Sequence, residues 1–298
     1  MKRIFTILAL AAISGFGFVS CDLLNLDDAD TIVSRDSIFD DDIAASQNEF
    51  DDWIKENLTD PYNIIVKYRF EDKESNTQYN LAPADYDKSI ALAKLTKYLW
   101  IDSYEELMGK DFVCTYAPKI LNFIGSVAYN SQGSVVLGTA EGGMKITLYN
   151  VNALDPDDLD IDFLNYWFFK TMHHEFAHIL HQTKSYSTDF NLISLDYQSA
   201  SWVNLDDQDA LDMGFISPYA SSEPQEDFVE LISIYVTNTA AYWNSLVNSA
   251  SADGKAKINQ KLDIVKDYLK TSWDIDIDKL RDIVQRRSGE IDTLDLTL

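Results

Sequence analysis

The chain has 298 residues, enough for one large domain or two small ones. Its hydrophobic fraction of 46% supplies a core, which argues against wholesale disorder. The formal net charge of -25 argues against binding nucleic acid and against electrostatic docking on anionic lipid, because both need clustered Lys and Arg. Only two cysteines are present, so a disulfide framework is excluded.

The first twenty residues have the pattern of a secretion signal. A short basic start precedes an almost unbroken apolar run over residues 4–18, shorter than the about 20 residues that a membrane-spanning helix needs. Val-Ser-Cys at residues 19–21 then resembles a lipobox, where a bacterial lipoprotein is cleaved and its Cys is acylated. We expect a signal peptide at residues 1–20 and lipid on Cys21. The alternative is a secreted protein in which Cys21 is incidental.

Residues 21–42 are strongly acidic and are predicted to form a solvated tether. The next segment, 43–118, is predicted to be an N-terminal α/β part. Its apolar periodicity and β-forming residues predict two helices and one strand; in chain order these are a helix over 48–58, a strand over 62–70 and a helix over 86–108.

Residues 119–298 are predicted to hold the catalytic domain; the alternative is that 43–118 and 119–298 form one continuous unit. Short strands are expected first, and then helices separated by a long loop at 183–224. The strands are predicted over 120–126, 134–138 and 144–150, and the helices over 160–182, 225–247, 252–272 and 277–287. Such an order favours an α+β fold.

Three histidines share one face of the helix predicted over 160–182, namely His174, His178 and His181. His174 and His178 form an H-E-x-x-H motif, in which two imidazoles one turn apart converge on one Zn²⁺. Glu175 points about 100° round the helix, toward the open coordination position, where a general base is needed. The alternative is that these are ordinary surface or core histidines.

The motif leaves the third ligand open. A metzincin would carry Gly and His where this chain has His181 and Lys184, so that pattern fails. His181 lies seven residues from His174, about 10.5 Å along the helix axis, too far for both to reach one ion comfortably. We therefore expect His181 to support the ligands or to line the pocket.

A later helix offers carboxylates instead. Pro224 suits the first turn of a helix, and Glu226 and Glu230 follow on one face, one turn apart. Glu226 is the expected third zinc ligand, and Glu230 is expected to accept a hydrogen bond from a ligating imidazole. Glu223, Asp227 and Glu230 are the alternatives for the third ligand.

Together, H-E-F-A-H at 174–178 and E-D-F-V-E at 226–230 resemble the gluzincin pattern, and more narrowly the catalytic domains of anthrax lethal factor type. In that type a Tyr seven residues before the ligand Glu stabilises the transition state, which implies this role for Tyr219. With the lipobox and the acidic tether, the chain is similar to the substrate import-associated zinc metallohydrolase lipoproteins of Bacteroidetes, also described as zinc-binding metallopeptidases.

This resemblance implies a zincin-like α+β fold with an active-site helix, a small sheet and C-terminal helices. It also implies an outer-membrane lipoprotein, at the cell surface or on the periplasmic face, that touches the membrane through its lipid only. The expected partners are a peptide or protein substrate and a TonB-dependent outer-membrane importer of nutrients.

The predicted function is a zinc-dependent metallopeptidase. The alternative is a catalytically weak or inactive zincin-fold lipoprotein that binds ligand for an importer, and hydrolysis of a non-peptide bond is a third possibility. Glu175 favours an enzyme, because a structural zinc site needs no acid at that position. The strand predicted over 144–150 is a hypothetical edge on which an extended peptide would pair.

Overall fold

The computed structural model describes residues 47–71, 79–129, 135–136, 138–141 and 144–298. The predicted signal peptide, the lipidation site Cys21 and the acidic tether lie outside these residues. Residues 48–298 form one compact unit, to which both predicted parts of the chain contribute. Among the described residues, no helix is both long enough and apolar enough to cross a membrane.

The first helix runs further than the sequence pattern predicts. α2 (Glu49–Ile54) continues through a π-helical segment, η2 (Lys55–Thr59), into α3 (Asp60–Tyr62). Asn63 ends it in the left-handed conformation, at φ 56°. The strand predicted over 62–70 is therefore reduced to β1 (Ile65–Lys67), because its first residues belong to the helix.

The helix predicted over 86–108 is confirmed as one run made of α4 (Tyr86–Leu95), the π-helical η4 (Thr96–Ile101) and α5 (Asp102–Met108). Asp85 caps its start by accepting from the backbone N–H groups of Asp87 and Lys88. Gly109, at φ 83°, ends it and permits the sharp turn into α6 (Lys110–Tyr116), which the sequence pattern did not predict.

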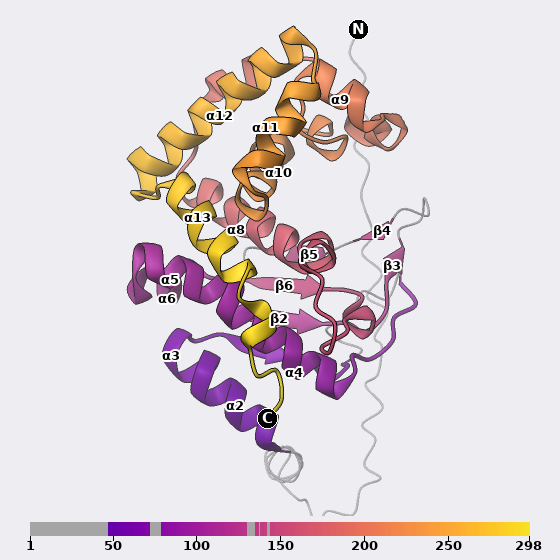
Figure 1. Ribbon diagram of the computed structural model, residues 1–298, viewed down its shortest axis with the longest axis vertical. Helices are drawn as coiled ribbons and strands as arrows, with labels where there is room; N and C mark the ends of the chain where they lie inside the picture. The colour runs from indigo at the N-terminus through magenta and orange to yellow at the C-terminus, as the bar shows by residue number, and fades with distance from the viewer. Residues whose placement is uncertain (1–46, 72–78, 130–134, 137, 142–143) are drawn as a thin grey trace, which may run out of the picture. The chain divides into compact units, whose positions relative to one another are not determined.

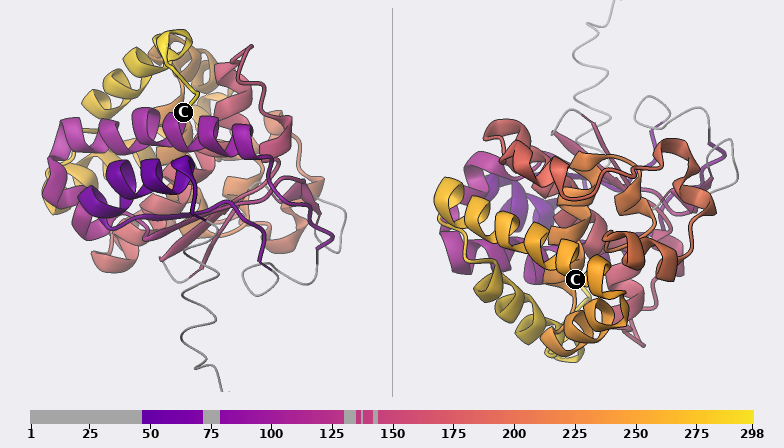
Figure 2. Two further views of the ribbon diagram at one scale, coloured as in Figure 1. Left: turned by 90° about the horizontal axis from the view of Figure 1, so that it is seen from below. Right: turned by 90° about the horizontal axis from the view of Figure 1, so that it is seen from above.

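A four-stranded sheet has the order β1-β2-β6-β5, with β2 (Ile120–Phe123), β6 (Lys145–Leu148) and β5 (Gly138–Glu141). β1, β2 and β6 are parallel, and β5 runs antiparallel to β6. Figure 2 shows the helices of residues 49–62 and 86–108 on one face of this sheet. A separate antiparallel pair joins β3 (Ala128–Tyr129) to β4 (Val135–Val136).

The hypothesis that the strand over 144–150 forms a free edge is wrong. β6 is hydrogen-bonded on both sides, to β2 and to β5, so β5 is the edge strand at this end of the sheet. β5 lies against the start of the histidine-bearing helix α8 (Lys170–Thr183). A Cβ atom at Gly138 would lie 2.4 Å from Cγ2 of Thr171, so only glycine permits this close approach.

The helix predicted over 160–182 is confirmed, as α7 (Ile161–Leu164), the π-helical η6 (Asn165–Phe169) and α8. The predicted loop carries short helical elements; they are η7 (Thr188–Leu192), η8 (Ser199–Asn204), α9 (Asp207–Met213) and η9 (Tyr219–Ser221). The first half of the chain also ends in a short 3₁₀ turn, η5 (Val151–Ala153), before α7.

The single helix predicted over 225–247 is wrong. It is divided into α10 (Pro224–Thr237) and α11 (Ala240–Ser249), because Asn238 is extended and the side chain of Thr239 caps a new helix. The last helices agree closely with their predicted ranges: α12 (Ala252–Trp273), α13 (Ile277–Ser288) and the short η10 (Ile291–Thr293). α10 packs against α8, α12 and α13, as Figure 1 shows.

Aromatic side chains from the first half of the chain pack against α8. Phe176, inside the H-E-x-x-H motif, packs edge-on against Trp100 at 5.2 Å and against Tyr104 at 4.8 Å between ring centroids. The hydroxyl of Tyr104 lies 3.0 Å from Nδ1 of the buried His173. Because α5 and α8 share these contacts, the two halves of the chain form one core around the motif.

Asp51 links the first helix to the segment after β1. Its carboxylate accepts from the backbone N–H of Asn48, the hydroxyl of Tyr68 and both terminal nitrogens of Arg69. Partial burial opposes its ionisation, but the hydrogen bonds from Arg69, Asn48 and Tyr68 hold the pKa of Asp51 below its usual value. The carboxylate therefore stabilises the fold above the pKa that Asp has in the unfolded chain.

We expect Asp51→Asn to lower the free energy of unfolding at pH 7 by about 1 kcal/mol, because it weakens a capping box and an ion pair. The deficit should shrink as the pH falls below 4, since the wild-type carboxylate is then protonated too. Urea unfolding of both proteins at several pH values measures this. Glu56→Gln, at an exposed position of the same helix, is the control; a deficit independent of pH would contradict the assignment.

Candidate metal centre

The packing of α10 against α8 brings three side chains to one point. His174 and His178 project from one face of α8, and Glu226 projects from the first turn of α10. Pro224 begins α10 and places Glu226 in that first turn, where a carboxylate also interacts favourably with the helix dipole. Among the described residues, this is the one group of His, Cys, Asp and Glu side chains whose atoms converge closely enough to hold a metal ion.

The donor atoms of this group suit Zn²⁺. Nε2 of His174 lies 3.2 Å from Nε2 of His178 and 3.1 Å from Oε2 of Glu226. Nε2 of His178 lies 3.3 Å from the same carboxylate oxygen. In a tetrahedral zinc site with bonds of about 2.0–2.1 Å, two ligand atoms are about 3.3 Å apart. Two imidazoles and one carboxylate also match the ligand set of catalytic zinc sites. The residues present therefore fit the metal.

Glu230 supports His174 from the other side of its ring. Oε1 of Glu230 lies 3.0 Å from Nδ1 of His174, so the ring donates there and directs Nε2 toward Glu226. Oε2 of Glu230 accepts from Ser217 at 2.8 Å and lies 3.1 Å from Nζ of Lys170. Burial opposes ionisation, but Lys170, His174 and Ser217 lower the pKa of Glu230 to about 2. Glu230 is thus a fixed, charged partner of His174.

His181 supports the second imidazole. Its Nε2 lies 2.9 Å from Nδ1 of His178, so His181 accepts a hydrogen bond that leaves Nε2 of His178 facing Glu226. Burial lowers the pKa of His181 to about 4, which keeps it neutral and able to accept. His181 is not in the converging group, as its distance along the helix predicts.

The cluster favours a cation among its donors. Burial opposes charge on His174, but the hydrogen bonds to Glu226 and Glu230 raise its pKa to about 9. Burial likewise opposes ionisation of Glu226, but His174 and His178 hold the pKa of Glu226 well below its usual range. A site with this preference for positive charge is suited to a divalent metal ion.

Glu175 and Tyr219 lie beside the His174–His178–Glu226 group. Both line a cavity of about 680 Å³ together with residues of the converging group and with Gly138 of the edge strand. Burial raises the pKa of Glu175. Burial and the neighbouring Glu226 also raise the pKa of Tyr219, whose ring lies 5.9 Å from that of His174, so its hydroxyl stays protonated and able to donate.

The other carboxylates considered as third ligands point elsewhere. Glu223 is exposed and accepts from the side chain of Gln225. Asp227 is buried and accepts from Nζ of Lys261 at 2.6 Å and from the hydroxyl of Tyr197 at 2.9 Å. This buried Asp227–Lys261 pair joins the first turn of α10 to α12, at the residue that follows Glu226.

Three side chains that contact residues of the site have no supporting role predicted from the sequence: Lys170, Ser217 and Trp202. Lys170 lies four residues before His174 on the same face of α8, so helical spacing alone could have identified it. No sequence pattern marks the other two. Ser217 reaches Glu230, and Trp202 reaches Tyr219, only because the segment between α8 and α10 folds back over the cluster.

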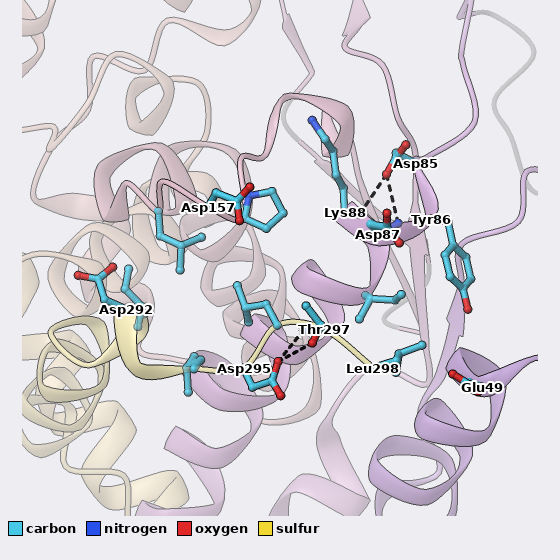
Figure 3. Close-up of a pocket in the computed structure, with 16 residues that line it drawn as sticks. Glu49, Asp85, Tyr86, Asp87, Lys88, Asp157, Asp292, Asp295, Thr297 and Leu298 are labelled. Atoms are coloured by element: carbon cyan, nitrogen blue, oxygen red, sulfur yellow. Dashed lines mark hydrogen bonds between the residues drawn. The ribbon is translucent and has the colours of Figure 1, made fainter.

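A second cavity, of about 930 Å³, lies among α4, the segment before α7 and the C-terminal residues 291–298. Figure 3 shows its many carboxylates. Two of them have local structural roles: Asp85 caps α4, and Asp295 accepts from Thr297. None belongs to the converging metal group, so this cavity is not the candidate centre.

Comparison with known proteins agrees with this geometry. The family model described as "Putative zinc-binding metallo-peptidase" matches residues 43–278. The chain belongs to this family. A crystal structure described as a "putative zinc-binding metallo-peptidase" from Bacteroides caccae is 44% identical, with a TM-score of 0.73, and the match covers 84% of this chain and 95% of that one. No curated protein matches the chain.

The zinc-binding metallopeptidase family implied by the resemblance is thus confirmed, and so is the α+β fold with a small sheet. The family name and the His-His-Glu group agree on zinc as the cofactor.

We expect Glu226→Ala to weaken Zn²⁺ binding by more than about 100-fold, because even the loss of a partner behind a ligand costs 10- to 100-fold. Competition with a zinc-binding dye measures the affinity of the folded protein. Glu223→Ala, three residues earlier and exposed, should bind Zn²⁺ like the wild type. Equal affinities of the two variants would contradict the ligand assignment.

Proposed function

We propose that this chain is a zinc-dependent peptidase of the gluzincin type, with Glu175 as general base. One observation carries the proposal: a carboxylate with a raised pKa lines an open cavity beside the His174–His178–Glu226 group. A site that only bound zinc for structural reasons would need neither the acid nor the cavity.

Zinc, held by His174, His178 and Glu226, would polarise the scissile carbonyl and lower the pKa of a water molecule toward neutrality. Glu175 takes a proton from the attacking water and then delivers it to the leaving amine. Burial suits Glu175 to the first step, because a carboxylate with a raised pKa is a stronger base than an ordinary carboxylate.

The hydroxyl of Tyr219 donates a hydrogen bond to the carbonyl oxygen, which becomes negative as the carbonyl is attacked. Its position beside His174 and in the cavity lining supports this role. The edge strand β5 lies next to the same cavity, whose lining includes Gly138. We propose that an extended peptide pairs with β5, which replaces β6 in this role.

We expect Glu175→Gln to retain zinc and to lower kcat on a mixture of quenched-fluorescence peptides by about 100- to 10,000-fold, the usual contribution of a general base. Wild-type activity should fall as the pH decreases through the raised pKa of Glu175, since the base must be ionised. If the wild type and Glu175→Gln cleave the same peptides, or if neither cleaves any, the result would favour a ligand-binding lipoprotein instead.

We also propose that Cys21 carries lipid and that residues 21–42 tether the domain to the outer membrane, at the cell surface and beside a TonB-dependent importer. The apolar run at residues 4–18, the Val-Ser-Cys sequence and the acidic residues that follow support this proposal.

We expect the wild type to incorporate an alkyne-labelled fatty acid and to fractionate with the outer membrane, and Cys21→Ser to do neither. Proteinase K added to intact cells should digest a surface-exposed wild type. Cys114→Ser is the control, since Cys114 belongs to the folded domain. Lipid incorporation by Cys21→Ser would refute the assignment, and resistance to the protease would indicate the periplasmic face.

A further inference from the structure

Tyr219 needs external support to keep a fixed position. It lies in the three-residue turn η9, and its side chain is 36% exposed. A ring on so short an element can rotate away from the cavity unless its neighbours restrict it. The ring of Trp202 provides such a neighbour, because it packs edge-on against the ring of Tyr219 at a centroid distance of 5.0 Å and an angle of 77°.

Backbone hydrogen bonds fix Trp202 relative to Tyr219. The N–H of Gln198 donates to the carbonyl of Ser221 at 2.7 Å, and the N–H of Ser199 donates to the carbonyl of Ser222 at 3.1 Å. Ser199 adopts the left-handed conformation, at φ 47°, which is disfavoured for a residue with a Cβ atom. Such strain persists where surrounding contacts hold it, and here it begins the turn η8 that carries Trp202.

The turn of Tyr219 is also held from the metal side. Oγ of Ser217 accepts from the N–H of Ala220 at 3.1 Å and donates to Glu230 at 2.8 Å. Glu230 in turn holds Nδ1 of His174. The turn is therefore attached to the ligand cluster through Ser217, while its outer side is covered by η8.

We propose that Trp202 is a positioning residue that holds the phenol of Tyr219 over the metal cluster. Trp202 is not among the described residues that line the cavity, and its ring contacts that of Tyr219, so the effect on the site is proposed to pass through Tyr219. Its large, rigid ring restricts Tyr219 to the orientation in which the hydroxyl reaches the neighbourhood of Glu226. The inference rests on the proposed role of Tyr219 in peptide hydrolysis.

A double-mutant cycle on the full-length, zinc-loaded protein tests the proposal. We expect Tyr219→Phe to lower kcat by about 100-fold, as the loss of one oxyanion donor does. Trp202→Ala should lower kcat by about tenfold through misplacement of the phenol, with little change in KM. In the Tyr219→Phe background the same substitution should change kcat by less than about twofold, because there is no hydroxyl left to misplace. Trp202→Phe should restore most of the activity.

Hydrogen exchange supplies a measurement that does not depend on activity. The peptide covering residues 217–223 should exchange faster in Trp202→Ala than in the wild type, and Trp202→Phe should restore its protection. Trp53→Ala is the matched control, because it also removes a tryptophan ring, one that packs on Phe50 in α2. It should leave both kcat and the exchange rate of residues 217–223 unchanged.

Three outcomes would overturn the proposal. Trp202→Ala could leave kcat unchanged, could lower it equally in both backgrounds, or could leave the exchange of residues 217–223 unaltered. These outcomes leave the proposed peptidase intact if Glu175→Gln remains inactive. If Tyr219→Phe has wild-type activity, the phenol has no role in catalysis. The proposed role of Tyr219 and this inference then both fail, while the proposed role of Glu175 is tested separately.

Discussion

Both ring nitrogens of His174 face a carboxylate of α10, Glu226 on one side and Glu230 on the other. This contact requires α8 and α10 to lie side by side in a single register, since the two carboxylates are one helical turn apart. Much of the surrounding structure maintains that register. Phe176 anchors the opposite face of α8 in the aromatic core, and the buried Asp227–Lys261 pair anchors the first turn of α10 to α12.

Three carboxylates lie around the cluster, and each has a different environment. Glu230 is buried but accepts hydrogen bonds and lies beside Lys170, which lowers its pKa, and Glu226 faces two imidazoles, which also lowers its pKa. Glu175 is half-buried, and its partial burial raises its pKa. The proposed support, ligand and base are thereby distinguished by environment among residues of the same type. The cost of burying charge is offset by paired cations and hydrogen-bond donors, of which Lys170 is the clearest example.

The segment between α8 and α10 completes the site. Its sequence has no periodicity long enough to predict a regular element, yet it folds into short helical turns stacked over the cluster. Backbone hydrogen bonds between distant turns hold this arrangement, and one residue accepts a strained conformation to make them. Strain of this kind is characteristic of functional sites, where neighbouring contacts over-determine the backbone.

The sequence by itself determined the parts of the site that lie on single helices. The spacing of His174, Glu175 and His178 follows from the period of the α-helix, as does the pairing of Glu226 with Glu230 on one face. Local signals also determined most helix positions, since caps and apolar periodicity act within a few residues. They failed where a tertiary contact or a single backbone conformation decides, as at Asn63, at Asn238 and in the interior placement of β6.

Only the tertiary structure decided which carboxylate meets the histidines. Glu223, Glu226, Asp227 and Glu230 all lie within two turns, and the crossing of α10 over α8 turns Glu226 and Glu230 toward His174 while Asp227 turns toward Lys261. The same packing decided that β5 is the edge strand and that Trp202 meets Tyr219. These contacts join segments far apart in the chain, and no local period encodes them, because they depend on the packing of the whole core.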